Sequence, residues 1–245
     1  MATIKFYCMT LDSRQDRQYK IKLEFKRLKI PIQWWIVKRH PEGGNYGCFE
    51  THVNVWENNN ADIAVIFEDD FEFKGDKNEF WQILNEAFTL SNKYDIIHLG
   101  NIAYRIDQQV SPNFYLGKFL TACCYVSRRE KLKNLIPIAK CYYGTQIDAV
   151  LSYIASQVGL LPCKVFQDFT DSNNAWTQNV PIVSKFPSIE SNIRINMTQD
   201  PYYLLKYHYI LTDCAVKFMI SLNIFQQLLP KLLYNTGIEF VDRRF

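Results

Sequence analysis

The chain has 245 residues, of which 48% are hydrophobic and 22% are charged, and its formal net charge is +3. A chain of this length and composition can bury a sizeable core, so global disorder is excluded. The net charge is too weak to indicate nucleic acid or a membrane surface, and we expect no nucleic-acid partner.

Strands and helices alternate through the first half of the chain. Ile4–Met9 reads as a strand closed by a turn at Thr10–Arg14, and Ser13 is the predicted N-cap of a basic helix that runs to about Leu28. The next predicted elements, in chain order, are a strand at Ile32–Val37, a loop at Pro41–Asn45, a helix at Cys48–Asn58, a buried strand at Ile63–Phe67 and a helix at Glu79–Leu90.

The same alternation continues to about residue 170. The predicted elements here are a buried strand at Asp95–Leu99 ended by Gly100-Asn101, a strand or hairpin at Tyr115–Val126, a helix at Arg128–Leu135 capped by Ser127, a helix at Ile147–Ser156 and a strand at Cys163–Phe166. This pattern predicts an α/β fold with a mainly parallel sheet flanked by helices.

We expect two parts, an α/β domain over residues 1–185 and a mainly helical C-terminal extension over residues 186–245. Asp200-Pro201 starts a helix well, and the tyrosines and leucines that follow favour a helix packed on the domain. The alternative is an acceptor platform or a helix in peripheral contact with a membrane. Asp213 and Lys217 interrupt every apolar run long enough to span a bilayer.

Charged residues and cysteines bear on the compartment. Asp12, Arg14 and Asp16 follow the short first strand at once, so no secretory signal is expected. Seven cysteines without a CxxC or His/Cys metal spacing indicate reduced, mostly buried thiols. We therefore expect a cytoplasmic protein, with a membrane-peripheral location as the alternative.

Three carboxylates, Glu68-Asp69-Asp70, follow the apolar strand that ends at Phe67. Ligands bind at this end of the strands in open α/β sheets. Like charges packed there need a positive partner, and a divalent cation such as Mn²⁺ or Mg²⁺ between the carboxylates and a diphosphate would supply one. The alternative is a solvated acidic turn.

Sequence blocks in a fixed order carry a family resemblance. They are Phe6 to Arg17 with Leu11-Asp12-Ser13-Arg14, Gly47-Cys48-Phe49-Glu50-Thr51-His52 followed by Trp56, Glu68-Asp69-Asp70, and then Asp95 to Gly100, Thr121 to Arg128, Ile147-Asp148 and Gln167 to Ser172. With these blocks the chain resembles glycosyltransferase family 25, which includes lipooligosaccharide and collagen galactosyltransferases. It departs from the family at Thr10, where Asn is usual, at Thr51, which replaces Ser, and in a short stretch between Val37 and Gly47 that bears on donor preference.

The resemblance implies a GT-A-like, Rossmann-like fold and an inverting transfer of a hexose, galactose or glucose, from a UDP-sugar to a hydroxyl on a glycan or protein. The expected metal ligands are Asp70, Glu68 and Asp168. The expected donor-binding residues are Leu11, Arg14, Arg17, Thr51, His52, Glu68, Asp69 and Gln167. Arg14 and Arg17 open the first helix, where guanidinium groups suit an anionic nucleotide, although surface charge is an equal alternative. His52 lies one turn from Trp56, and a structural role is the favoured alternative for it.

An inverting transfer needs a carboxylate that accepts the proton of the acceptor hydroxyl. By resemblance Asp148 is the candidate base, and it opens a helix after Gly144-Thr145-Gln146. A role as a helix cap or as a partner of the donor is equally open. Asp168 is the rival base, and it could instead complete the metal shell.

Two other functional classes compete. One is a non-catalytic GT-A-like domain that binds a nucleotide sugar or a glycan, and the intact carboxylates Glu68-Asp69-Asp70 and Asp148 argue against it. The other is a nucleotidyltransferase, which would carry a glycine-rich phosphate loop where this chain has Thr10-Leu11-Asp12-Ser13.

Overall fold

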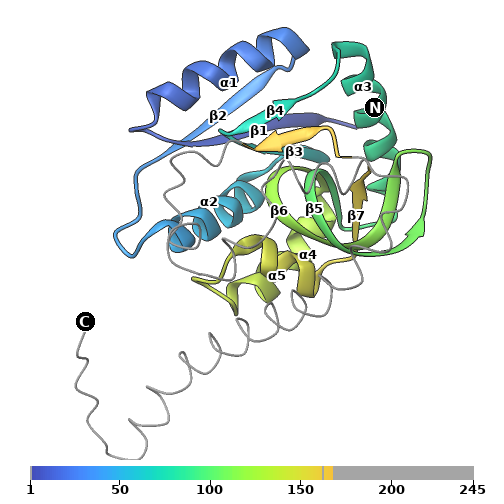
Figure 1. Cartoon of the computed structure of the whole chain (residues 1–245). Helices are drawn as coiled ribbons and strands as arrows, with labels where there is room; N and C mark the ends of the chain where they lie inside the picture. The colour runs from blue at the N-terminus through green and yellow to red at the C-terminus, as the bar shows by residue number, and fades with distance from the viewer. Residues whose placement is uncertain (1, 162, 168–245) are drawn as a thin grey trace, which may run out of the picture.

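A computed structural model of the chain describes residues 2–161 and 163–167. Within them, one sheet of order β2-β1-β3-β6-β5-β7 lies between two layers of helices (Figure 1). This confirms the expected α/β fold, a Rossmann-like sheet with helices on both sides. The C-terminal extension predicted for residues 186–245 lies outside the described residues.

Three parallel strands form the N-terminal part of the sheet, namely β1 (Ile4–Leu11), β2 (Ile32–Val37) and β3 (Ile63–Glu68). β1 lies between the other two, and its Met9 pairs with Glu68 of β3. The carboxyl ends of β1 and β3 therefore lie side by side. Successive residues of β1 point to opposite faces, so the strand supplies both helix layers with core residues.

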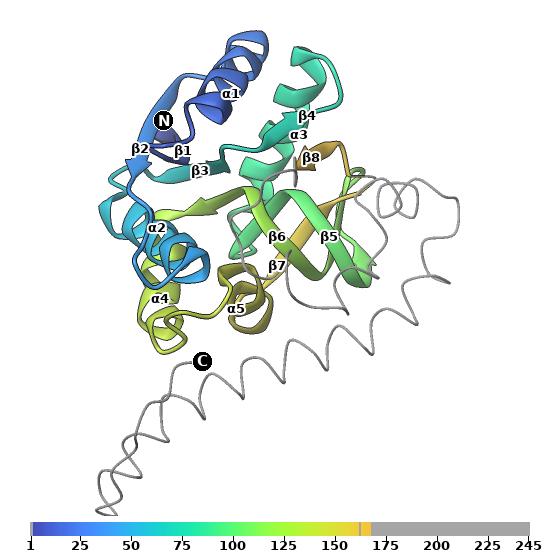
Figure 2. The same cartoon turned by 60° about the vertical axis from the view of Figure 1, so that its left-hand side comes forward.

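Helices α1 (Gln15–Leu28) and α3 (Lys77–Leu90) cover one face of the sheet (Figure 2). The buried residues of α1 are Ile21, Phe25 and Leu28, spaced so that they share one side of a helix. Asp76 caps α3 by accepting a hydrogen bond from the backbone N–H of Glu79 at 2.9 Å. This cap starts α3 two residues before the predicted Glu79.

Helices α2 (Gly44–Asn58), α4 (Arg129–Lys140) and α5 (Ile147–Ile154) cover the opposite face. They bury a second apolar layer against β1, β3 and β6. Its members from the helices include Phe49, Val53, Trp56, Leu132, Leu135, Val150 and Leu151. The first turns of α2 and α5 lie near the end of β3, since Cys48 of α2 contacts Glu68 and the charges of Glu68 and Asp148 both act on Cys48.

The remaining strands, β5 (Ile96–Gln109), β6 (Phe114–Arg128) and β7 (Gln157–Leu160), close into a small, strongly bent unit. β6 is antiparallel to β3, β5 and β7, while β7 is parallel to the start of β5. The sheet is therefore mixed, and the expected parallel arrangement holds for the β2-β1-β3 part and for β5 with β7. A small apolar cluster fills the bend, formed by Ala103, Phe119 and Leu161.

A second, two-stranded sheet joins β4 (Phe71–Phe73) to β8 (Val165–Gln167) in antiparallel register. β4 follows directly after Asp70, and Gln167 pairs with Phe71. The pairing of β4 with β8 therefore brings the end of β8 next to the acidic residues, although β5, β6 and β7 lie between them in the chain.

Several predicted boundaries are wrong for identifiable reasons. The N-cap of α1 is Arg14 and not Ser13, and the position makes no side-chain cap hydrogen bond. Ser127 does not cap α4, because its hydroxyl donates to the carbonyl of Asp95 at 2.7 Å. The strand predicted to end at Gly100 continues to Gln109, since its pairing with β6 absorbs the glycine through shifts in register.

Two further sequence expectations concern cysteines and membrane spans. The six cysteines within the described residues are free thiols; four of them are buried, Cys48 is half-buried and Cys141 is exposed. This agrees with the expected reduced state. Among the described residues, none of the helices is both long and apolar enough to cross a bilayer.

Candidate active site at the carboxyl ends of the central strands

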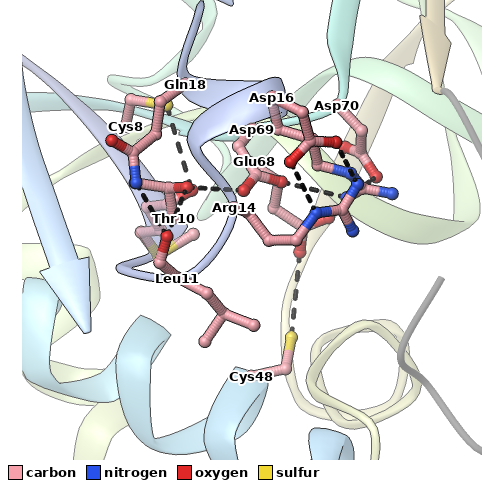
Figure 3. Close-up of polar contacts among 12 residues, drawn as sticks. Cys8, Thr10, Leu11, Arg14, Asp16, Gln18, Cys48, Glu68, Asp69 and Asp70 are labelled. Carbon is pink, nitrogen blue, oxygen red and sulfur yellow. Dashed lines mark hydrogen bonds and ion pairs between the residues drawn. The ribbon is translucent and has the colours of Figure 1, made fainter. Parts of the chain in front are cut away.

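The acidic residues lie where β3 ends beside β1, next to the first turn of α1 (Figure 3). Asp69 accepts a hydrogen bond from the hydroxyl of Thr10 at 2.6 Å, and its second oxygen lies 3.0 Å from Nη1 of Arg17. The same nitrogen lies 3.4 Å from Asp70. Thr10, at the position where the family usually has Asn, thus holds Asp69 from the neighbouring strand.

Arg17 places a positive charge between two of the three carboxylates. The side chains of Arg17, Asp69 and Asp70 are 14%, 11% and 8% exposed, so this ion pair is largely shielded from water. Arg17 therefore neutralises part of the negative charge of the carboxylates, for which the sequence suggests a metal ion. Asp69 is thus held from both sides, by Thr10 of β1 and by Arg17 of α1.

Arg14 lies at the N-cap of α1, beside the acidic residues (Figure 3). Its guanidinium pairs with Asp16 at 2.7 Å, and this hydrogen bond lowers the pKa of the exposed Asp16 carboxyl. The backbone N–H of Arg14 donates to the carbonyl of Leu11 at 3.1 Å, which closes the turn between β1 and α1. Leu11, Arg14 and Arg17 are thus gathered at one helix N-terminus, a position that favours anions.

His52 is fully buried in α2 and forms part of a polar chain that ends on Glu68. Trp56 donates to the Tyr125 oxygen at 2.8 Å, the Tyr125 hydroxyl lies 2.7 Å from Nδ1 of His52, and Nε2 of His52 lies 3.1 Å from Glu68. Because Trp56 can only donate, Tyr125 is free to donate to Nδ1, and the proton on Nε2 is then directed at Glu68. The histidine fixes the orientation of Glu68, as the structural alternative for His52 would have it, and a contact with the donor stays a prediction.

Cys48, His52 and Glu68 also form a candidate metal site, with ligand atoms within 4.8 Å of one another. Thiolate and imidazole ligands would suit a softer ion such as zinc. Burial raises the pKa of the Cys48 thiol well above its ordinary value, and the charges of Glu68 and Asp148 raise it further. Both ring nitrogens of His52 already have hydrogen-bond partners. As the three side chains stand, they form a hydrogen-bonded group around Glu68.

Asp148 begins the first turn of α5 and faces the same region. Its two oxygens accept hydrogen bonds from the backbone N–H groups of Thr121 at 3.0 Å and Ala149 at 2.8 Å. Burial raises the pKa of its carboxyl, those hydrogen bonds oppose the shift, and the charge of Glu68 adds to it. Thr121 has a φ of 69°, a conformation that is strained for a β-branched residue and that Asp148 helps to hold.

The other predicted site residues have different surroundings. Thr51 is buried, and its hydroxyl donates to the carbonyl of Gly47 within α2 at 2.6 Å, so its nearest partner is the helix backbone. Gln167 lies in β8 opposite Phe71, the residue after Asp70. Asp168, expected as a metal ligand or rival base, lies outside the described residues.

Sequence reasoning does not single out Thr10, Thr121 or Tyr125 as parts of the site. Tyr125 and Thr121 lie within a block of the family resemblance, but neither residue type marks a chemical role by itself. Thr10 stands out in the sequence only as a departure from the usual Asn. The contacts of these residues with Asp69, Asp148 and His52 all join positions distant in sequence, which pattern and spacing do not reveal.

Comparison with known proteins gives one family match. The family model described as glycosyltransferase family 25 (LPS biosynthesis protein) matches residues 35–160. The match includes the block from Gly47 to Trp56, the acidic residues and Asp148. None of the curated proteins matches the chain.

Solved structures are similar at low sequence identity. Mannose-1-phosphate geranyltransferase from Thermus thermophilus aligns with a TM-score of 0.45 and 10% identity, over 68% of this chain and 76% of that chain. A197 from STIV aligns with a TM-score of 0.40 and 12% identity, over 67% and 83% of the two chains. CMP:2-keto-3-deoxy-manno-octonic acid synthetase complexed with CTP aligns with a TM-score of 0.38 and 11% identity, over 65% and 90%.

Proposed function

Since the chain belongs to glycosyltransferase family 25, we propose that it is a metal-dependent enzyme that transfers a hexose from a UDP-sugar to an acceptor hydroxyl, with inversion at the anomeric carbon. The observation that carries the proposal is the meeting of Glu68 and Asp70, the N-terminus of α1 and Asp148 at one edge of the sheet. The family description as LPS biosynthesis proteins supports a glycan acceptor.

The donor diphosphate would lie between the acidic residues and the first turn of α1. Glu68 and Asp70 offer the carboxylate oxygens that suit Mn²⁺ or Mg²⁺. The cation would neutralise the charge that develops on the departing UDP. Arg17 keeps the carboxylates in place, while the N–H groups at the start of α1, with Arg14, favour the phosphates.

The acceptor hydroxyl would be deprotonated by Asp148. A base is more effective as its pKa approaches the working pH, and burial moves the pKa of Asp148 in that direction. The hydrogen bonds from Thr121 and Ala149 fix the carboxylate without removing its capacity to accept a proton, because each oxygen has two lone pairs. Asp168 remains the rival for this role.

A donor screen tests the proposal. The purified chain would be incubated with UDP-galactose, UDP-glucose and other UDP-sugars, with Mn²⁺ or with a chelator, and release of UDP would be measured. Release from one or two UDP-hexoses that depends on the metal is the expected result. If the chain binds a UDP-sugar and releases no UDP with any acceptor, it is a non-catalytic binding domain, and the proposal fails.

A further inference from the structure

A group of aromatic side chains lies where the start of α2 meets the turn between α4 and α5. The rings of His40 and Tyr46 stack at 5.8 Å and 14°, and Tyr46 meets Tyr143 edge to face at 5.4 Å. Tyr143 also packs edge to face on the buried Phe49 at 5.7 Å. We call His40, Tyr46 and Tyr143 the aromatic platform. Tyr143 is 39% exposed, and the other two rings are half-buried.

Two glycines allow these rings to approach the backbone closely. A Cβ at Gly144, whose φ is +83°, would lie 2.5 Å from the ring of Tyr46. A Cβ at Gly47 would lie 3.0 Å from Cβ of His40. The Tyr143 hydroxyl lies 3.4 Å from Nε2 of His40, which links the two ends of the platform. The rings are therefore held in a fixed arrangement, as a preorganised binding surface requires.

The aromatic platform adjoins the candidate base. Tyr143 is five positions before Asp148, and Thr145 and Gln146 between them form the turn that starts α5. On the other side, Tyr46 and Phe49 lie on the first turns of α2, which also carry Cys48 beside Glu68. The charge of Asp148 acts on Cys48, which lies between Tyr46 and Phe49 in α2, so a ligand on the platform would lie near Asp148.

We propose that the aromatic platform is an acceptor subsite that stacks an uncharged pyranose ring, so that one of its hydroxyls faces Asp148. This proposal rests on the proposed function, because it names the acceptor of that transfer. Half-exposed tyrosines present an apolar ring face together with a polar hydroxyl, which matches a sugar with one apolar face and a rim of hydroxyls.

The charges around the platform support an uncharged ligand. His40 pairs with Glu50 at 3.4 Å and accepts a hydrogen bond from the backbone N–H of Glu42 at 3.1 Å. Burial raises the pKa of the Tyr143 hydroxyl, and the charges of Glu50 and Glu42 raise it further, so both carboxylates lie near the rings. They can accept hydrogen bonds from sugar hydroxyls, and they would repel a sugar that carries a carboxylate or phosphate.

Saturation-transfer NMR on the full-length protein tests the proposal. The probes are methyl β-galactoside, methyl β-glucoside and lactose at millimolar concentration, with methyl β-glucuronide as a charged probe and a serine-containing peptide as a non-sugar probe. The variants are Tyr143→Ala, Tyr143→Phe and, as a control, Tyr19→Ala, which removes a tyrosine that is 66% exposed on α1. Metal-dependent hydrolysis of the UDP-sugar is measured for each protein as a readout of the donor site.

We expect a neutral sugar to bind the wild-type protein, and binding to weaken roughly tenfold in Tyr143→Ala. Tyr19→Ala should bind as the wild type does, and Tyr143→Phe should bind with an affinity between those of the wild type and Tyr143→Ala, because it keeps the ring face and loses the hydroxyl. Donor hydrolysis should be unchanged in all three variants. Failure of every neutral sugar to bind, equal binding by Tyr143→Ala, or preference for the glucuronide or the peptide would overturn the proposal. If sugar binding depends on Tyr143 but no UDP is released, the platform stands and the proposed transfer fails.

Discussion

At the scale of single residues, the site is built from strained or buried groups whose partners come from other elements. Thr121 keeps a left-handed backbone at φ 69° while its N–H donates to Asp148 and its hydroxyl donates to the carbonyl of Gly100. Strain of this kind persists only where surrounding contacts enforce it, and it is concentrated at functional sites. Through its two hydrogen bonds, Thr121 of β6 connects Asp148 with Gly100 of β5.

The role of Asp148 can be separated from donor binding. Asp148→Asn should abolish most transfer, because an amide cannot take the proton of the acceptor hydroxyl. The KM for the UDP-sugar should stay close to that of the wild type, because base and donor contacts are separate. Steady-state kinetics with the donor and acceptor varied in turn would measure both. Loss of donor binding would instead make Asp148 a donor ligand, and unchanged transfer would leave Asp168 as the base.

A second residue-level prediction concerns the pH dependence of stability. His98 is fully buried, and burial lowers its pKa from 6.5 to about 3, against a smaller opposing effect of the nearby Thr121 backbone. Between these values the unfolded chain binds a proton that the folded chain does not. The stabilising contribution of neutral His98 is therefore complete above pH 6.5 and is lost as the pH falls, at about 1.4 kcal/mol per pH unit.

Urea unfolding of the wild type and of His98→Gln between about pH 7 and about pH 4.5 would measure this contribution. Glutamine does not titrate, so the two curves of unfolding free energy against pH should converge as the pH falls. Parallel curves would mean that His98 has the same pKa in the folded and unfolded states, and they would contradict the prediction.

At the scale of elements, helix α2 connects the sequence block from Gly47 to Trp56 with the acidic residues at the end of β3. His52 and Trp56, one turn apart, converge on the hydroxyl of Tyr125 in β6, and His52 then reaches Glu68 at the end of β3. Hydrogen bonds thus link α2, β6 and β3, and they end at the carboxylate of Glu68. We therefore expect the block from Gly47 to Trp56 to act through the orientation of Glu68.

Tyr125→Phe removes the hydroxyl that both Trp56 and His52 contact. It should lower the free energy of unfolding by about 1–3 kcal/mol, since two buried polar groups lose their partner. It should also lower kcat/KM for the donor by roughly tenfold, because Glu68 is no longer fixed by an oriented histidine.

Tyr7→Phe is the matched control, since the hydroxyl of the equally buried Tyr7 contacts Asn59 at 3.0 Å and not the Glu68 network. This variant should lose stability and keep its kcat/KM. Equal kinetic effects of the two substitutions would show that Tyr125 serves only the stability of the core.

The elements differ in how far the sequence predicts them. Ile63–Phe67 is an uninterrupted apolar run that predicts a buried strand, because a short continuous run of this kind is typical of a strand that is buried on both faces. The sequence does not predict β7, since its four residues contain Gln157 and a glycine and gain their stability from pairing with β5 and β6. The antiparallel course of β6 is likewise set by pairing, which local pattern does not encode.

The candidate site, like the fold, is only partly predictable from local sequence. Three adjacent carboxylates after a buried strand are recognisable by residue type alone. In the structure they lie close to Arg17 and to Asp148, and Arg14 lies beside them (Figure 3). The pairing of Arg17 with Asp69 joins residues 52 positions apart and depends on how α1 lies on the sheet. The sequence therefore leads us to expect Arg17 against phosphates, and it does not reveal that Arg17 pairs with Asp69 and Asp70.

At the scale of the whole molecule, the described residues form the α/β part, and the predicted C-terminal extension lies beyond them. Its aromatic and leucine-rich sequence would expose a large apolar patch if it were not docked. A chain truncated after Met197 should therefore be recovered mainly in the insoluble fraction on expression, compared with the full chain by fractionation. A soluble truncation that still releases UDP would show that the extension serves binding, to an acceptor or to a membrane.

The central claim is that carboxylates at the end of β3 hold the cation that assists departure of UDP. The most direct measurement compares UDP release by the wild type, by Asp70→Asn and by Asp107→Asn, in Mn²⁺ buffers whose free metal is set by a chelator. Asp107 lies on β5 and pairs locally with Arg105, so it serves as the control. We predict that Asp70→Asn reduces turnover at least about 100-fold while the protein stays folded, and that Asp107→Asn leaves it unchanged. Wild-type turnover by Asp70→Asn would contradict the account.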